Sequence, residues 1–152
     1  MISPAVQADL LKYSKYHNSD NFADFSFICS DGVKIPAHRL MISANSPMME
    51  AMLATSMTES SSQQVKVDDI NSNTMIEILR FIYTKNLLYI NNDQIIELLY
   101  GAEKYQLPDL KDFCKKTMIN NISIDNIFEY YSVADQYDLK DLLECCIRFI
   151  KA

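Results

Sequence analysis

The hydrophobic period of this chain changes near Asp24, and this change restricts the fold more than any other feature. Before it, apolar residues recur at a spacing of three, as on one face of a helix. After it, alternate positions are apolar: Phe25, Phe27 and Cys29. The pair Asp31-Gly32 is a favoured turn and is followed by another short run at residues 33–35. The sequence therefore predicts a helix followed by a β-hairpin.

Proline and serine mark the ends of further elements. We expect Pro36 to end the second strand, because proline has no N–H to donate to a ladder. Ser3-Pro4 and Ser46-Pro47 each combine an N-cap residue with proline at the first helical position, which predicts a helix start. Residues 55–64 have no apolar period and predict a loop, whereas the alternation at 64–68 predicts a third strand.

Helical spacing accounts for most of the remaining chain, apart from residues 88–90, which fit a small edge strand. Helices are expected at residues 38–44 and after Ser72, Asn92 or Asp93, Pro108, Ser123 and Asp138, with the serine, asparagine and aspartate residues as caps. Met75, Leu79 and Ile82 are expected to face the core from the helix after Ser72, and Ile95, Leu98, Leu99 and Ala102 from the next helix. The apolar residues that give the other helices their spacing are Leu40, Met41, Ala44, Leu110, Phe113, Cys114, Ile127, Tyr131, Ala134, Leu139, Leu142, Leu143, Cys146 and Ile150. The predicted fold class is α+β: a small, mostly three-stranded sheet, helices packed on it and a C-terminal helical pair.

Composition excludes several classes of partner. The chain has 20 acidic and 14 basic residues, a net charge of −6, which argues against a nucleic acid partner. No apolar run approaches the roughly 18 residues of a membrane span, and residues 1–20 do not look like a secretory signal. We therefore expect an intracellular protein, cytoplasmic and/or nuclear, with no membrane partner.

The residue types of catalytic and metal sites do not gather in the sequence. Its cysteines, Cys29, Cys114, Cys145 and Cys146, lack C-x-x-C spacing and are expected to be reduced and mostly apolar in role. His38, next to a strand end, is expected to be a hydrogen-bonded structural residue. The serines at residues 60–62 lack the setting of an activated nucleophile. We expect no enzyme activity, no cofactor and no metal.

Five short motifs in a fixed order resemble the BTB (POZ) family, and no single one of them would suffice. They are Asp24 before the first strand, Ala37-His38-Arg39, Ser46-Pro47, Phe81-Ile82-Tyr83-Thr84, and Ala102-Glu103-Lys104-Tyr105-Gln106-Leu107. The chain looks most similar to the speckle-type POZ branch, whose members carry a MATH substrate domain. The resemblance implies an N-terminal dimerisation helix at 1–21, a BTB/POZ core at 22–120, and a helical extension at 121–152 that resembles a three-box or the start of a BACK region.

The resemblance also implies a function: a homodimeric adaptor that binds a cullin of the third type and helps to recruit substrates for ubiquitination. Met57-Thr58-Glu59 matches the family's cullin-binding pattern of an apolar residue, any residue and glutamate. Tyr105, Tyr130 and Tyr137 are further cullin-binding candidates. Nothing in the chain resembles a substrate domain, so the substrate would be held by a domain absent from this chain or by a partner.

The homodimer is expected to use the first helix and the residues around its junction with the sheet. In the family, the positions of Asp24 and Arg39 line a charged pocket at the interface, and apolar area would come from Leu10, Tyr13, Tyr16 and Met41. Two alternatives remain open. The chain could be the dimerisation module of a transcriptional regulator, or a stand-alone competitor of longer BTB adaptors.

Overall fold

The computed structural model describes residues 3–59, 63–87 and 90–152, without the side chains of residues 55–59. The elements in chain order are α1 (Pro4–Leu11), the 3₁₀ helix η1 (Lys12–Tyr16), β1 (Phe25–Ile28), β2 (Lys34–Ala37), α2 (Arg39–Asn45), α3 (Pro47–Glu59), β3 (Gln64–Lys66), α4 (Ser72–Thr84), α5 (Asn92–Lys104), α6 (Pro108–Asn120), α7 (Ile127–Gln136) and α8 (Lys140–Lys151). A small sheet and many helices confirm the predicted α+β class.

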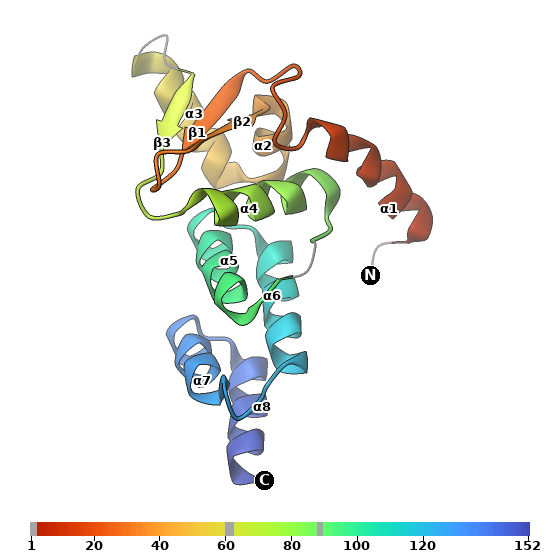
Figure 1. Cartoon of the computed structure of the whole chain (residues 1–152), viewed down its shortest axis with the longest axis vertical. Helices are drawn as coiled ribbons and strands as arrows, with labels where there is room; N and C mark the ends of the chain where they lie inside the picture. Colours follow the sequence, from red (N-terminus) through yellow and green to blue (C-terminus); the bar gives the residue numbers. More distant parts are fainter. Residues whose placement is uncertain (1–2, 60–62, 88–89) are drawn as a thin grey trace.

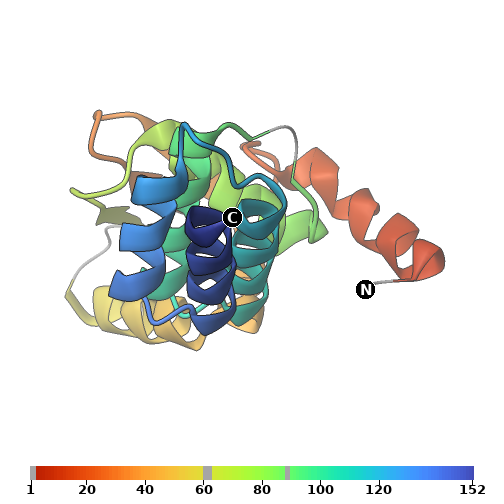
Figure 2. The same ribbon diagram turned by 90° about the horizontal axis from the view of Figure 1, so that it is seen from below.

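The elements form layers stacked along the longest axis of the molecule (Figure 1). The sheet lies at one end with α2 and α3, α4 crosses below it, α5 and α6 form the next layer, and α7 and α8 form the last. In contrast, α1 projects sideways from the stack, as the view from below also shows (Figure 2). Among the described residues, no helix is long and apolar enough to cross a membrane.

The sheet has three described strands in the order β2-β1-β3. β1 and β2 form the predicted antiparallel hairpin, with Phe27 opposite Ile35. β3 confirms the predicted third strand and pairs with β1 in parallel, so that Val65 also lies opposite Phe27. The alternation in β1 buries Phe25 and Phe27 against the helices. The hairpin signal in the sequence was therefore sufficient to place this part of the core.

Two predicted ends are wrong. β2 does not end before Pro36 but continues through it to Ala37. This is possible because β2 is at the edge of the described sheet, where a missing donor is tolerated. The predicted loop at residues 55–64 is also wrong in its first half, since α3 runs on to Glu59. The predicted strand at 88–90 falls largely on residues 88–89, which lie outside the described part of the chain.

The predicted caps of four helices are one to three residues out of place. Asn71, not Ser72, caps α4, because its Oδ1 accepts the Thr74 N–H at 2.9 Å. Asn91 caps α5 in a capping box with Gln94, rather than Asn92 or Asp93. The other two cap positions are Asn126 at α7, in place of Ser123, and Leu139 at α8, in place of Asp138. Neither Asn126 nor Leu139 makes a side-chain capping hydrogen bond, so at these two starts the backbone, and not a capping side chain, sets the first residue of the helix.

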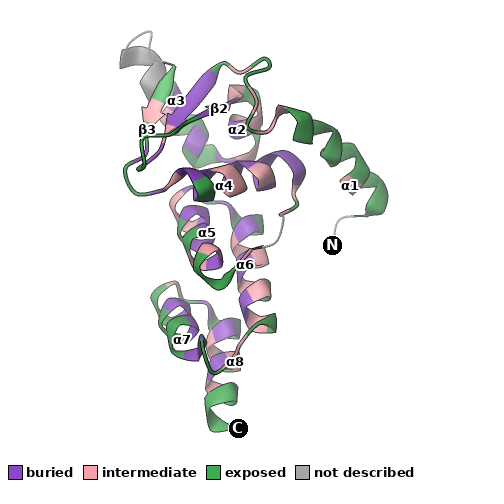
Figure 3. Ribbon diagram, viewed as in Figure 1, coloured by how far each residue is buried: buried purple, intermediate pink, exposed green. Residues whose placement is uncertain are grey.

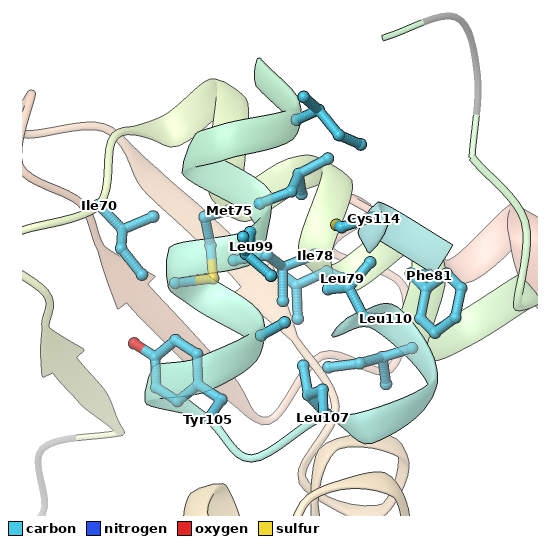
Figure 4. Packing of buried hydrophobic residues seen from close by; sticks show 14 of the residues in the cluster. Ile70, Met75, Ile78, Leu79, Phe81, Leu99, Tyr105, Leu107, Leu110 and Cys114 are labelled. Carbon is cyan, nitrogen blue, oxygen red and sulfur yellow. The ribbon is translucent and has the colours of Figure 1, made fainter. Parts of the chain in front are cut away.

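Buried residues form one cluster that extends through all layers. Figure 4 shows its centre, where Ile78 and Leu79 of α4 meet Leu99 of α5 and Leu110 of α6. The helices approach closely at Gly101, where an added Cβ would collide with the Ile78 side chain. A larger residue at this position would therefore force the Ile78 side chain to shift in the packing of α4 on α5.

The seven predicted core positions of α4 and α5 are confirmed as buried, whereas several apolar residues that mark the other helices are not buried. Leu40 is 81% exposed, and Ile42 is the buried residue of α2. Ala44, Tyr131 and Ile150 are exposed as well, while Met41 and Phe113 are only half-buried. Tyr130 and Val133 fill the positions expected for Tyr131. Leu143 of α8 is half-buried too. Short amphipathic helices allow more than one inward stripe, so their period alone does not choose the buried face.

A buried serine joins the sheet end to the helical layer. Ser46, which is fully buried, accepts the Met49 N–H at 3.1 Å and donates its own hydrogen to the Tyr105 carbonyl at 2.7 Å. One hydroxyl therefore caps α3 and also satisfies the carbonyl at the end of α5.

We expect Ser46→Ala to lower the free energy of unfolding by about 1–3 kcal/mol, because it removes a cap and leaves a buried carbonyl without a donor. Urea denaturation monitored by circular dichroism measures this change. Ser3→Ala is the matched control, since Ser3 also caps a helix but is exposed. Equal, small changes in both variants would contradict the role assigned to Ser46.

Candidate protein-protein interface

The first helix packs little of its surface against its own chain. None of its residues is buried, and Figure 3 shows it exposed along its length. Apolar side chains on α1 and η1 nevertheless point into solvent, among them Val6, Leu11 and Tyr13. Of the predicted dimer residues on this segment, Leu10 is half-buried, Tyr13 is exposed and Tyr16 packs against the core. The segment is therefore an apolar surface available to a partner.

Two histidines hold this segment to the core. The Nε2 atom of His17 lies 2.7 Å from the Ile76 carbonyl of α4, and since a carbonyl only accepts, Nε2 carries the proton. Burial lowers the pKa of His17 below its usual value. The Tyr16 ring meets the rings of Phe22 and His38 edge to face, with centroid distances of 6.2 and 5.9 Å. These contacts fix the direction in which α1 leaves the body.

His38 bridges the N-terminal segment and α4, which confirms its expected structural role. Its backbone N–H donates to the Tyr83 hydroxyl at 3.0 Å, so that hydroxyl is free to donate its hydrogen to Nδ1, at 2.7 Å. Nε2 must then hold the ring proton, which it donates to the Asn21 carbonyl at 2.7 Å. The bond to the Asn21 carbonyl thus places a ring proton on Nε2.

Asp24 and Arg39, which are expected at a dimer interface, contact each other within the chain. The Asp24 Oδ1 atom accepts the backbone N–H of Arg39 at 2.8 Å and so holds the start of α2. The guanidinium lies over the Phe25 ring, 5.1 Å from its centroid, and its Nε donates to the Asp24 carbonyl at 3.4 Å. The Nη1 atom of Arg39 is buried and has no hydrogen-bond partner among the described residues.

Two large apolar residues at this surface were not predicted from the sequence. Phe22 is 86% exposed and its ring meets the Tyr16 ring. Leu40 is 81% exposed and follows His38, whose ring also meets Tyr16, by two residues. Met41, which was predicted, is half-buried. A turn of 100° per residue separates Leu40 from Ile42 by about 200° on α2, so burial of one exposes the other. We refer to α1, η1, Phe22, Arg39 and Leu40 as the N-terminal surface.

The residues predicted to bind a cullin are not gathered in one described site. Met57 and Glu59 occupy the last turns of α3, and their side chains lie outside the described residues. Tyr105 and Tyr130 are only 2% and 1% exposed, so direct contact of these rings with a partner does not fit the structure. The Tyr130 hydroxyl donates to Asn92 at 2.8 Å. Only Tyr137 is partly exposed.

Among the described residues, no three His, Cys, Asp or Glu side chains are placed to hold a metal ion. The described cysteines are free, and three of them are buried. Burial raises the pKa of the Cys114 thiol to about 12, which keeps this thiol protonated at neutral pH.

A model of the BTB/POZ domain matches residues 13–122. The chain belongs to the BTB/POZ family. Domains of this family are protein–protein interaction modules that commonly dimerise, which is consistent with the exposed N-terminal surface. The motifs running from Asp24 to Leu107 had predicted this family from the sequence.

Curated relatives include longer proteins. The chain is 28% identical over 141 residues to BTB/POZ domain-containing protein At4g08455 of Arabidopsis thaliana, a match that covers 90% of this chain and 58% of the relative. It is 29% identical over 141 residues to Protein maternal effect lethal 26 of Caenorhabditis elegans, covering 92% of this chain and 35% of that protein. The chain therefore spans about a third to three fifths of the length of these relatives.

Solved structures confirm the BTB/POZ fold. The BTB domain of human gigaxonin matches with a TM-score of 0.62 and 24% identity, over 77% of this chain and 94% of that domain. The BTB domain of zebrafish PATZ1 matches with a TM-score of 0.63 and 16% identity, over 80% and 97%. At such identities the likeness concerns the fold alone.

The buried hydroxyl of Tyr83 predicts an alkaline loss of stability. Burial, with a smaller effect of the negative Asp24, raises the pKa of Tyr83 to about 12, although the hydrogen bond from the His38 backbone N–H acts in the opposite direction. The unfolded chain ionises at its ordinary value near 10, so this contribution to stability is complete below pH 10 and is lost as the pH rises towards 12. The difference in unfolding free energy between the native chain and Tyr83→Phe should shrink by about 2–3 kcal/mol over this range.

Urea unfolding at a series of pH values from 9 upward measures this difference. Tyr13→Phe is the control, since it also removes a phenol hydroxyl but from the exposed η1 segment. A difference that stays constant with pH for Tyr83→Phe would contradict the buried, neutral hydroxyl.

Proposed function

We propose that this BTB/POZ chain is a homodimeric adaptor that joins a substrate to a cullin of the third type in a ubiquitin ligase. The observation that carries the dimer is the N-terminal surface, in which α1 has no buried residue while Phe22 and Leu40 are almost fully exposed. Exposed apolar patches on soluble proteins mark sites of association. A second copy placed on this surface by a two-fold axis would cover the same residues in both chains.

The polar groups of the N-terminal surface also favour a second copy of the chain as the partner. The buried Nη1 atom of Arg39 lacks a hydrogen-bond acceptor within its own chain's described residues. A buried, unpaired donor costs free energy, and a turn of the Arg39 guanidinium towards an acceptor of a second chain would remove that cost. The Asp24 carboxylate lies at the same place, where it already holds the Arg39 backbone. Both residues were predicted at the interface from the sequence.

The proposed cullin surface lies on the other side of the molecule. Figures 1 and 2 both place α1 on one side, and α7 together with the C-terminal end of α3 on the opposite side. Dimerisation through α1 would therefore leave the end of α3 accessible in both copies. Two attachment points raise the effective concentration of a bound substrate near the ligase without new contacts.

The cullin assignment is supported by Met57 and Glu59 at the end of α3 and by the helices beyond the BTB/POZ match. Methionine is a flexible apolar anchor, and a nearby glutamate can pair with a basic residue or with a partner helix start. The helical pair is tied to the core through Lys115 of α6, whose Nζ lies 3.2 Å from the Asp141 carboxylate of α8. The substrate would be bound by a domain outside this chain or by a partner protein, as the resemblance to the speckle-type branch suggests.

Sedimentation tests the homodimer. We expect the native chain to sediment at micromolar concentration as a species of twice its 17.5 kDa mass. Leu40→Asp places a charge in the middle of the covered apolar area and should return it to the monomer, whereas Val33→Asp, a matched change at the exposed hairpin turn, should remain dimeric. A native chain that sediments only at 17.5 kDa would refute the homodimer.

Capture by an immobilised cullin tests the adaptor role. We expect Met57→Glu or Glu59→Lys to lower capture by at least about tenfold while leaving the circular dichroism spectrum unchanged, because hot-spot residues contribute about 2 kcal/mol or more. Met48→Glu and Glu50→Lys are matched controls at the opposite, exposed end of the same helix. Capture that is unchanged by the first pair of variants would overturn the cullin site.

A further inference from the structure

A cavity of about 400 Å³ lies in the seam between the BTB/POZ core and the C-terminal helical pair. It is formed by the start of α4, one face of α5 and the end of α7. Three side chains give it an apolar floor: Ile70, Ile96 and Val133. The rings of Tyr100 and Tyr137 are in its wall, and Glu97 is among its polar lining residues. The cavity thus combines apolar, aromatic and acidic surfaces.

The Glu97 carboxylate is positioned but not neutralised. Its Oε2 atom accepts the Thr74 hydroxyl at 2.5 Å and the Asn71 side-chain amide at 3.3 Å. Both donors are uncharged, and among the described residues no Lys, Arg or His forms an ion pair with Glu97. Its other oxygen, Oε1, accepts none of these bonds. The carboxylate is therefore held in place with its charge available to a ligand.

The second acid of the cavity is in a different state. Asp69 is paired with Lys104 at 2.5 Å and also accepts the Tyr100 hydroxyl. These bonds hold the pKa of Asp69 below its usual value, and its charge is already balanced by Lys104. The same bond to Asp69 fixes the Tyr100 ring beside the cavity. The uncompensated charge of the lining therefore belongs to Glu97.

We propose that this cavity receives the arginine side chain of an extended basic segment of another protein. The methylene stem would cover the floor at Ile96 and Val133, and the planar guanidinium would lie against a tyrosine ring and donate to Glu97 Oε1. Arginine fits better than lysine because its head group can stack and form paired hydrogen bonds at the same time. The chain's net charge of −6 favours encounter with a basic segment.

This inference goes beyond the adaptor function. The cavity shares only Tyr137 with the residues proposed for cullin binding and none with the N-terminal surface. Arginine binding therefore requires neither a dimer nor a cullin, and each of the three properties can fail separately.

Nuclear magnetic resonance titration of the whole chain with N-acetyl-arginine amide tests the proposal. We expect saturable shifts of the Ile96 and Val133 methyl groups and of the Thr74 amide. N-acetyl-citrulline amide, which has the same shape without the charge, should give no saturable shift, and N-acetyl-lysine amide should bind more weakly. No saturable shift with the arginine probe, or equal shifts with the citrulline probe, would overturn the proposal.

Variants of the chain distinguish arginine binding in the cavity from nonspecific attraction of arginine to an acidic protein. Glu97→Gln should weaken arginine binding by about tenfold, since it replaces a charged acceptor by a neutral one of the same shape. Glu144→Gln makes the same change of charge on the exposed side of α8 and should leave binding unchanged. Equal losses in both variants would mean nonspecific attraction and refute the site. Tyr137→Leu provides a second cavity variant that keeps the carboxylate, and it should also weaken binding.

Discussion

Burial of α4 on both of its sides is the constraint on which the rest of the structure depends. The helix lies between the sheet layer and the α5–α6 layer, and apolar residues such as Met75, Ile78 and Leu79 fill the contacts. Close approach of α5 is possible because Gly101 has no side chain to displace Ile78. Nine of the thirteen residues of α4 are buried, and only Asn73, Ile76, Glu77 and Arg80 are not, so the helix needs contacts on most of its circumference. The layered order of the molecule follows from this requirement.

The same helix also determines where the exposed surfaces lie. Its Ile76 carbonyl and Tyr83 hydroxyl bind the two histidines that position the N-terminal segment. At its start, Asn71 and Thr74 hold the Glu97 carboxylate of the cavity. Groups of one buried helix therefore organise surfaces on different parts of the molecule. Their positions rest on core packing rather than on mobile loops.

Local sequence signals predicted the helices and strands of this fold well. They did not predict which of two neighbouring residues of similar type caps a helix. The alternation from Phe25 to Cys29 predicts a strand, and the two Ser-Pro pairs predict helix starts. The structure contains this strand and both helices. Asn71 and Ser72 are both good capping residues, and the choice between them depends on Asp31, which accepts the Ser72 hydroxyl from 41 residues away. No local pattern contains that contact.

The candidate interface was predictable only where family motifs mark it. Asp24 and Arg39 were found in this way, and the structure places them in contact. Phe22 carries no motif, and its exposure depends on a backbone bend at a positive φ of 60°. The cavity at Glu97 joins residues from three helices with no common spacing, so it becomes visible only once α7 is packed against α5.

The stacking of layers has a consequence for how the molecule opens. In the C-terminal layer, α8 packs on α6 and α7 is joined to α5 by the Tyr130–Asn92 hydrogen bond, and this layer lies at the end of the stack far from the sheet (Figure 1). Each layer in such a stack is stabilised mainly by its contacts with the neighbouring layers. The amide hydrogens of α7 and α8 can therefore exchange with solvent by detachment of this last layer alone. Those of α4, enclosed by layers on both sides, are released only when the whole domain unfolds.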